Sequence, residues 1–126
     1  MQTKVLLSIK PEFADLIFAG TKKFEFRRAI FRSSSVKTVV VYASSPIQQV
    51  IGEFDIGRVL ELGVDELWKK TGKHSGIEKE YFDRYFEQRD TGYAIEVRRP
   101  KLYKHPKAID SVAGTSKPPQ SFCYIS

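Results

Sequence analysis

The segment Gly20–Arg28 holds the residues whose types and spacing best suit chemistry. It reads Gly-Thr-Lys-Lys-Phe-Glu-Phe-Arg-Arg, and so contains four cations, one carboxylate and two aromatic rings. The guanidinium of Arg27 can grip a phosphate or a base edge bidentately, and the ammonium of Lys22 can supply a point charge to the same anion. The carboxylate of Glu25 can orient both cations or accept a hydrogen bond from an exocyclic amine such as that of cytosine. These three side chains are the first candidates for a ligand site.

The alternation of residue types in this segment predicts how these groups are presented. In a strand, successive side chains point to opposite faces, so Phe24 and Phe26 share one face. Glu25 and Arg27 share the other face, which we expect to line a cleft. Truncating Arg27, or Lys22 near the turn, is therefore expected to leave the fold intact. The pattern also fits a solvated strand whose Glu25 and Arg27 pair with each other. Lys22, in turn, also fits a residue that only caps the preceding helix.

Three further polar side chains are candidates for the same cleft. Ser44 and Ser45 follow a buried strand, and Pro46 would stiffen their turn. Their hydroxyls can contact a ligand, although a Ser-Ser-Pro sequence also fits a plain turn. Lys10 ends the first predicted strand near the same helix, and its ammonium is a less specific candidate.

Hydrophobic periodicity predicts about six strands and two or three helices. Helices are expected over residues 11–19, 64–71 and 77–86, where apolar residues recur at helical spacing. In the first of these helices, Pro11 suits the first turn and Gly20 the C-terminus. Gly52 and Gly57 are expected bulges within one long strand, and Pro100 is expected to end another. The predicted strands are Lys4–Lys10, Lys23–Arg28, Val36–Ala43, Val50–Leu60, Gly92–Val97 and Phe122–Ile125.

This order of elements favours an α+β fold that is mainly β. Short strands with glycine corners and few helical crossovers indicate a small β-barrel, closed or partly closed, with helices at its ends. The length of 126 residues and a hydrophobic content of 41% indicate one domain spanning residues 1–126. The aromatic stripe of the third helix is expected to lie in the core rather than to stack on a ligand; its residues are Ile77, Tyr81, Phe82, Tyr85 and Phe86.

The charge balance favours a polyanionic partner, with RNA or DNA first. Lys and Arg number 21 against 15 acidic residues, which gives a net charge of +6. The exposed cations Lys101, Lys104 and Lys107 are expected to be solvated, or weak phosphate contacts at most. The single cysteine, Cys123, fits a packed strand residue, and no zinc motif is present, so we expect no metal and no cofactor. The absence of a long apolar run predicts no membrane partner and a cytoplasmic location.

The residues quoted above resemble the ASCH (ASC-1 homology) domain, a family of the PUA-like superfamily. Gly20-x-Lys22-x-x-Glu25-x-Arg27 is similar to its G-x-K-x-x-E-x-R signature, and the flanking segments 7–11, 42–46, 51–53 and 118–122 are similar to those of small stand-alone members. The resemblance implies a PUA-like β-barrel with a cleft beside the signature. It also implies binding to RNA.

One branch of the family hydrolyses the amide of N4-acetylcytidine, using a lysine at the position of Lys22 and a threonine at that of Glu25. Because Glu25 lacks that hydroxyl, this activity is not expected here. Other members are linked to RNA cleavage, so hydrolysis stays an alternative. Catalysis by Lys22 and Glu25 would lack a clear third group, whereas binding needs only a charged cleft. The sequence therefore favours an RNA- or nucleotide-binding module over a small hydrolase acting on a modified nucleoside or on RNA.

Overall fold

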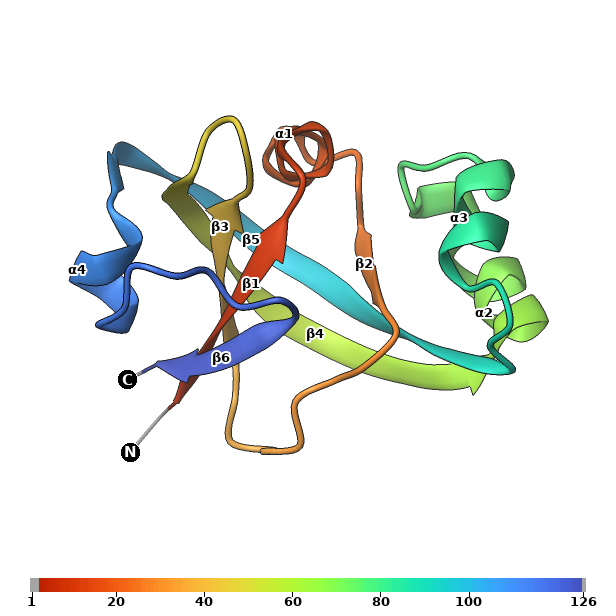
Figure 1. Ribbon diagram of the computed structural model, residues 1–126. Coiled ribbons are helices and arrows are strands. Elements are labelled where there is room, and N and C mark those ends of the chain that lie inside the picture. Colours follow the sequence, from red (N-terminus) through yellow and green to blue (C-terminus); the bar gives the residue numbers. More distant parts are fainter. Residues whose placement is uncertain (1–2, 126) are drawn as a thin grey trace.

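The structure of the protein is a computed structural model, in which residues 3–125 are described. It is an α+β structure, mainly β, whose six strands form one sheet in the order β2-β5-β4-β3-β1-β6 (Figure 1). β1 and β3 are parallel, and all other neighbours are antiparallel. The strands are β1 (Lys4–Ile9), β2 (Phe24–Arg27), β3 (Thr38–Ala43), β4 (Gln49–Gly63), β5 (Thr91–Lys107) and β6 (Phe122–Ile125). The helices are α1 (Pro11–Ala19), α2 (Val64–Thr71), the 3-10 turn η1 (Gly72–His74), α3 (Lys79–Tyr85) and α4 (Ile109–Ala113).

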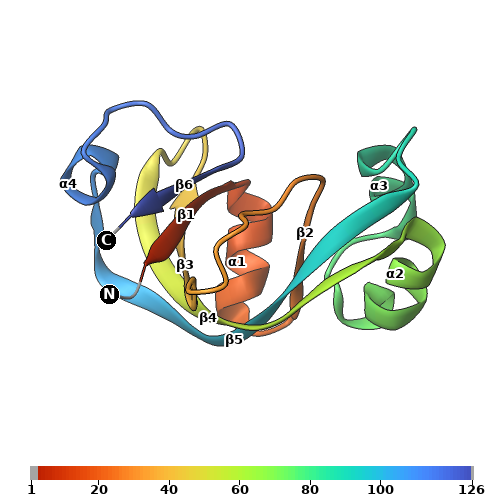
Figure 2. The same cartoon turned by 90° about the horizontal axis from the view of Figure 1, so that it is seen from below.

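The predicted barrel is not confirmed, because the sheet stays open. β2 and β6 are its two ends, and within residues 3–125 no strand pairing joins them. Seen from below, the sheet curls around α1, with β2 on one side of the helix and β1 on the other (Figure 2). Side-chain hydrogen bonds from Arg27 cross from β2 to the carbonyls of Ser8 and Ser121. In a closed barrel, paired strands would join the two ends of the sheet. Here the Arg27 side chain connects β2 with β1 and with the segment before β6 instead.

The β4–β5 pair is longer than the sequence predicts. Pro100 does not end β5, because it lies with Arg99 in a bulge between the pairs Asp55–Arg98 and Glu53–Lys101. A bulge tolerates proline, since no ladder hydrogen bond is required there, and Arg99 adopts a left-handed φ of 48°. A second bulge lies at Gly57, as expected. The five-residue α4 follows β5 in a segment for which the sequence analysis predicted no helix.

Three apolar clusters fill the space around the sheet. α1 packs Ala14 and Ile17 into the first cluster, with residues from the central strands. α4 packs Ile109 into the second cluster, on the side of β1 and β6. The third lies at the far end of β4 and β5, where α2 and α3 cover the start of β5 and β2 (Figure 1). This third cluster fixes the position of α3 relative to β2, and thereby shapes the candidate site.

The inward orientation predicted for Phe24 and Phe26 is confirmed. Both rings are buried in the third cluster, and the Phe26 ring meets that of Phe82 edge to face at a centroid distance of 5.0 Å. Such aromatic pairs contribute about 0.5–1.5 kcal/mol beyond the area they bury. No helix within residues 3–125 combines the length and apolar character needed to cross a bilayer.

Candidate functional site

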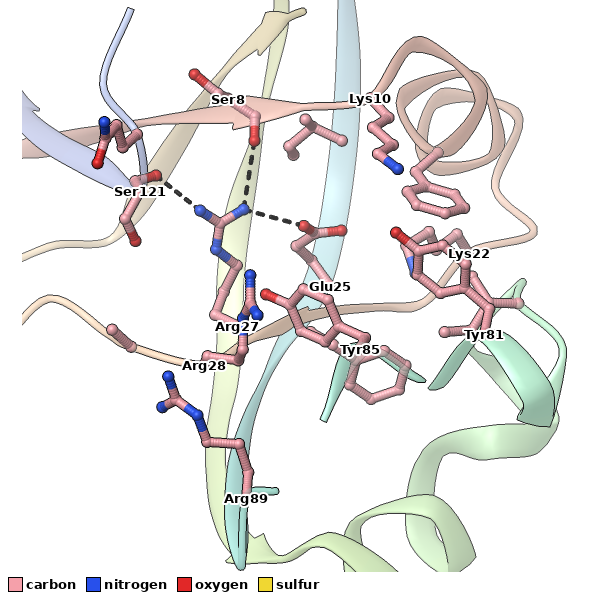
Figure 3. A pocket seen from close by; sticks show the side chains of 16 residues that line it. Ser8, Lys10, Lys22, Glu25, Arg27, Arg28, Tyr81, Tyr85, Arg89 and Ser121 are labelled. Carbon is pink, nitrogen blue, oxygen red and sulfur yellow. Dashed lines mark hydrogen bonds and ion pairs between the residues drawn. The ribbon is translucent and has the colours of Figure 1, made fainter. Parts of the chain in front are cut away.

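A pocket of about 540 Å³ lies between β2, α1 and α3, within the size range of small-molecule sites (Figure 3). Its walls combine aromatic rings with cationic side chains and a single carboxylate. The lining residues are Ser8, Ile9, Lys10, Phe13, Lys22, Glu25, Phe26, Arg27, Arg28, Ala29, Ile77, Tyr81, Tyr85, Arg89, Gln120 and Ser121.

The C-terminus of α1 places Lys22 in the pocket wall. Gly20 adopts a left-handed φ of 86°, which lets the chain reverse directly after the helix. The backbone N–H of Lys22 then donates to the carbonyl of Leu16, so the capping alternative is correct for its main chain. The side chain serves another purpose, because its Nζ donates to the carbonyl of Ser75 at 2.8 Å.

The Lys22 ammonium is held in an unusually dry setting. The residue is only 2% exposed, and its Nζ lies 5.4 Å from the ring centroid of Phe13 and 5.2 Å from that of Phe26. Burial lowers the pKa of Lys22 from its ordinary value, although the nearby Glu25 carboxylate acts in the opposite direction. The pocket therefore contains an amine that gives up its proton more readily than a surface lysine does.

Glu25 and Arg27 lie next to each other on the pocket floor and are both buried. A guanidinium nitrogen of Arg27, Nη1, lies 3.4 Å from Oε2 of Glu25 and also donates to the carbonyl of Ser8. The other terminal nitrogen, Nη2, donates to the carbonyl of Ser121 at 2.8 Å (Figure 3). Arg27 lines the pocket, as expected, but it is buried and hydrogen-bonded, so the expectation that it can be truncated freely is wrong. The same holds for the buried Lys22. The hydrogen bonds of Arg27 tie β2 to β1 and to the segment before β6.

α3 presents two different aromatic faces. Phe82 and Phe86 are buried in the third cluster, as the sequence analysis predicted for the whole stripe. Tyr81 and Tyr85 are half-buried and line the pocket, with nearly parallel rings whose centroids are 6.4 Å apart. The prediction that the stripe belongs to the core therefore fails for Tyr81, whereas Tyr85 packs against the third cluster and also lines the pocket. Burial raises the pKa of Tyr85, which keeps its phenol neutral.

The remaining pocket cations are exposed. Within residues 3–125, Arg28, Arg89 and Lys10 form no ion pair with a carboxylate. The Arg28 guanidinium lies 4.6 Å from the ring centroid of Tyr85, and the Lys10 Nζ lies 5.5 Å from that of Tyr81. These cations thus keep hydrogen-bond donors for a ligand, while those of Arg27 are used within the protein.

The structure brings four of the six predicted site residues together. Lys10, Lys22, Glu25 and Arg27 line the pocket. Ser44 and Ser45 are not among the lining residues of this pocket. They lie in the turn after β3, where the N–H of Ser44 donates to the carbonyl of Ile9 and Ser45 precedes a cis proline.

The sequence analysis missed several residues of the pocket. Arg28 belongs to the segment Gly20–Arg28 that the sequence analysis selected, and the helical spacing of Tyr81 and Tyr85 could be read from the sequence. Ser121, however, reaches Arg27 across 94 positions of sequence. Only the predicted C-terminal strand, Phe122–Ile125, hinted at that contact. Its register, with Phe122 opposite Leu7, sets the position of Ser121.

Comparison with known proteins identifies the family. The model of the ASCH domain matches residues 7–101, three quarters of the chain and most of the pocket. The chain belongs to the ASCH domain family. Lys22, Glu25 and Arg27 all line its pocket.

Two curated relatives cover almost the whole of this ASCH chain. One is the large ribosomal subunit protein uL22 of Ureaplasma parvum serovar 3, which is 30% identical over 96% of the chain. The chain spans only 39% of the length of that relative. The other is the ASCH domain-containing ribonuclease of Zymomonas mobilis, which is 26% identical over 97% of this chain and 84% of the relative.

The solved structures include the ASCH protein from Zymomonas mobilis. It superimposes with a TM-score of 0.87 and 26% sequence identity, covering 98% of this chain and 87% of that one. The similarity extends beyond residue 101, so it includes α4 and β6. The segment that carries Gln120 and Ser121 into the pocket is therefore within the shared fold.

Proposed function

We propose that the pocket binds one nucleotide unit of an RNA chain. The observation that carries this proposal is that Tyr81 and Tyr85, the exposed cations Arg28 and Arg89, and the Glu25 carboxylate all line one pocket. A nucleotide has an aromatic base, a polar base edge and a phosphate. The pocket offers one kind of group for each of these parts.

The aromatic wall suits the base. Every base has a π-face, and stacking on a tyrosine contributes about 1–3 kcal/mol per base. The two rings are inclined by only 12° to each other, so they present similarly oriented faces. Glu25, whose side chain is 8% exposed, can accept a hydrogen bond from an exocyclic amine of a base that enters the pocket.

The cationic wall suits the phosphate. Arg28 and Arg89 are exposed and form no ion pair within residues 3–125, whereas Arg27 already donates to two carbonyls and to Glu25. We therefore assign the phosphate contact to Arg28 and Arg89, with Lys10 as a further point charge, and a supporting role to Arg27. Ser44 and Ser45, away from the pocket, are left out of the proposal.

The comparisons support RNA as the polymer. The relative from Zymomonas mobilis is named as an ASCH domain-containing ribonuclease, and the match covers 97% of this chain and 84% of that relative. The pocket chemistry and the family therefore point to the same class of ligand.

The test is the affinity of a short single-stranded RNA for variants of Tyr85. Tyr85→Ala removes the ring, and we expect a loss of about 5- to 150-fold, which corresponds to stacking of one base. Tyr85→Phe keeps the ring and is the matched control, with near-wild-type affinity. Fluorescence anisotropy measures both, and thermal melts check that the variants are folded. Equal affinities of Tyr85→Ala and wild type would refute the pocket as the site.

A second candidate function is cleavage of the bound RNA, which the lowered pKa of Lys22 favours. A neutral amine can take the proton of a ribose 2′-hydroxyl as its oxygen attacks the adjacent phosphorus and the 5′-oxygen leaves with a proton. That reaction would yield a 2′,3′-cyclic phosphate and a 5′-hydroxyl end. Glu25 is a second titratable group of the pocket that can take part in the proton transfers.

The second candidate is tested by incubating purified protein with labelled RNA and, separately, with N4-acetylcytidine. Cleavage by wild type that is lost in Lys22→Met and Glu25→Gln would make the protein a ribonuclease. We expect no deacetylation of N4-acetylcytidine, because Glu25 offers no hydroxyl nucleophile. Rapid deacetylation that disappears in Glu25→Ala would contradict that expectation.

A further inference from the structure

The second half of β5 is a strongly cationic surface away from the pocket. Residues 98–107, called the basic ribbon below, read Arg-Arg-Pro-Lys-Leu-Tyr-Lys-His-Pro-Lys. All are exposed except the half-buried Tyr103. The ribbon runs toward α4, at the end of β5 opposite to α2 and α3 (Figure 1). None of its residues lines the pocket.

Most of the net charge of the protein resides in this ribbon. It contains five of the 21 Lys and Arg residues and none of the 15 acidic residues. The rest of the chain therefore has 16 cations against 15 acids, so it supplies only +1 of the total of +6. The signature segment Lys22–Arg28, with four cations and one carboxylate, is less charged than the ribbon.

Neighbouring carboxylates neutralise only part of this charge. Arg98 pairs with Glu96 at 3.2 Å and Arg99 with Asp55 at 2.8 Å. Lys101, Lys104 and Lys107 form no ion pair within residues 3–125. The nearby Glu53 is already engaged, because it accepts a hydrogen bond from Tyr103 at 2.8 Å and pairs with Lys4 at 3.7 Å. Three ammonium groups thus remain available to a partner.

The backbone of the ribbon is unsuited to a partner strand. β2 pairs with β5 only over residues 93–96, so the ribbon has a free edge within the described residues. Two prolines, Pro100 and Pro106, lack N–H donors, and bulges interrupt the register with β4. Addition of a peptide strand would need a regular ladder there. A partner recognised through side-chain charges, such as a phosphate backbone, fits this edge better.

We infer that the basic ribbon is a second RNA-binding surface, which contacts phosphates of the chain outside the nucleotide held in the pocket. The choice of RNA as the polyanion rests on the proposed function. A strand rises about 3.3 Å per residue, so ten residues span at most about 33 Å. That length is sufficient for several phosphates, whereas the pocket holds one nucleotide. Such contacts carry no sequence information and are weakened by salt.

The test compares two double variants in the full-length chain. Lys101→Ala with Lys104→Ala removes two exposed cations of the ribbon that form no ion pair within residues 3–125. Lys70→Ala with Lys73→Ala makes the same charge change at exposed positions of α2 and η1, outside both surfaces. Binding of a 20-nucleotide single-stranded RNA and of cytidine monophosphate is measured from 50 to 200 mM salt.

We expect the ribbon variant to reduce the slope of log K against log salt by about 1.4 for the 20-mer, because each single-strand phosphate contact contributes about 0.7. Its affinity for the mononucleotide should not change, and the control variant should retain the wild-type slope. An unchanged slope in the ribbon variant, or an equal change in the control, would overturn the inference. So would ribbon-dependent binding to anionic lipid vesicles with unaltered RNA binding.

The two proposals fail in different ways. If wild type binds the 20-mer but not the mononucleotide, and the ribbon variant still reduces the slope, the ribbon stands and the pocket is refuted. If the mononucleotide binds and the slope does not respond, the pocket stands and the ribbon is refuted.

Discussion

The pocket and the basic ribbon are both cationic, but they hold their charges in opposite ways. In the pocket, Lys22 and Arg27 are at most 9% exposed, and each donates hydrogen bonds to backbone carbonyls. In the ribbon, Lys101 and Lys104 are exposed and form no ion pair in the described chain. A buried charge is costly to desolvate and must be fixed in place, whereas a solvated one costs little and attracts at a distance.

The number of cations in a region therefore does not indicate whether that region recognises its ligand specifically. The pocket charges are held at fixed positions around an aromatic wall, which suits the reading of one nucleotide. The ribbon charges are free to adjust, which suits a repeating phosphate backbone. The account therefore divides RNA binding into a positioning part at the pocket and an attracting part at the ribbon.

The largest expected difference between the two regions concerns stability. Arg27→Ala would leave the buried Glu25 without its cation and would free the carbonyls of Ser8 and Ser121. Loss of one partner from a buried pair typically costs about 3–5 kcal/mol of the free energy of unfolding. Lys101→Ala should change it by less than about 0.5 kcal/mol. Urea unfolding at neutral pH measures both. Equal stabilities of the two variants would contradict the division between buried, fixed charges in the pocket and solvated charges in the ribbon.

A smaller difference is expected in the affinity for a mononucleotide. Arg28→Ala and Arg89→Ala each remove a donor that is assigned to the phosphate, and each should cost about 1.5–3 kcal/mol of binding. Both side chains are exposed, so the melting temperatures should stay close to that of wild type. Calorimetric titration with cytidine monophosphate provides the measurement. The double variant of Lys101 and Lys104 in the ribbon is the control. A comparable loss of mononucleotide affinity in that variant would contradict the distinction between pocket and ribbon.

The smallest effect concerns the pH dependence of stability. Burial lowers the pKa of Lys22 in the folded protein, so between that value and the ordinary 10.5 the unfolded chain binds more protons. The free energy of unfolding therefore gains a contribution that rises with pH across this window, by at most about 1.4 kcal/mol per pH unit. The difference between wild type and Lys22→Met should show that rise. If the difference in the free energy of unfolding between wild type and Lys22→Met does not change with pH up to pH 10.5, Lys22 titrates normally.

The sequence predicted those features that depend on neighbouring residues. Pro11, Gly20 and the alternation of Phe24 and Phe26 define α1 and β2 locally, and the structure has both elements at almost the expected bounds. Lys22, Glu25 and Arg27 were predicted as site residues for the same reason, because they lie within six positions of one another. Local spacing could not show that Arg27 is buried, since its partners Ser8 and Ser121 come from distant parts of the chain.

The division of α3 was also beyond the reach of periodicity. Residues 81, 82, 85 and 86 form one broad apolar stripe on a helical wheel, and the sequence does not state which edge of it the core covers. The packing of Phe82 against Phe26 decides this, and it leaves Tyr81 and Tyr85 facing the pocket. Similarly, Pro100 reads as the end of a strand until the bulge opposite β4 is known.

The most direct test of the account is an NMR titration of the isotopically labelled chain with unlabelled cytidine monophosphate. The account predicts saturable shifts of the backbone amides and side-chain resonances of Tyr81, Tyr85, Arg28 and Arg89, with the ribbon resonances unchanged. Chemical-shift changes at residues 98–107 without changes at the pocket residues would contradict the account, because the nucleotide would then be bound by charge alone.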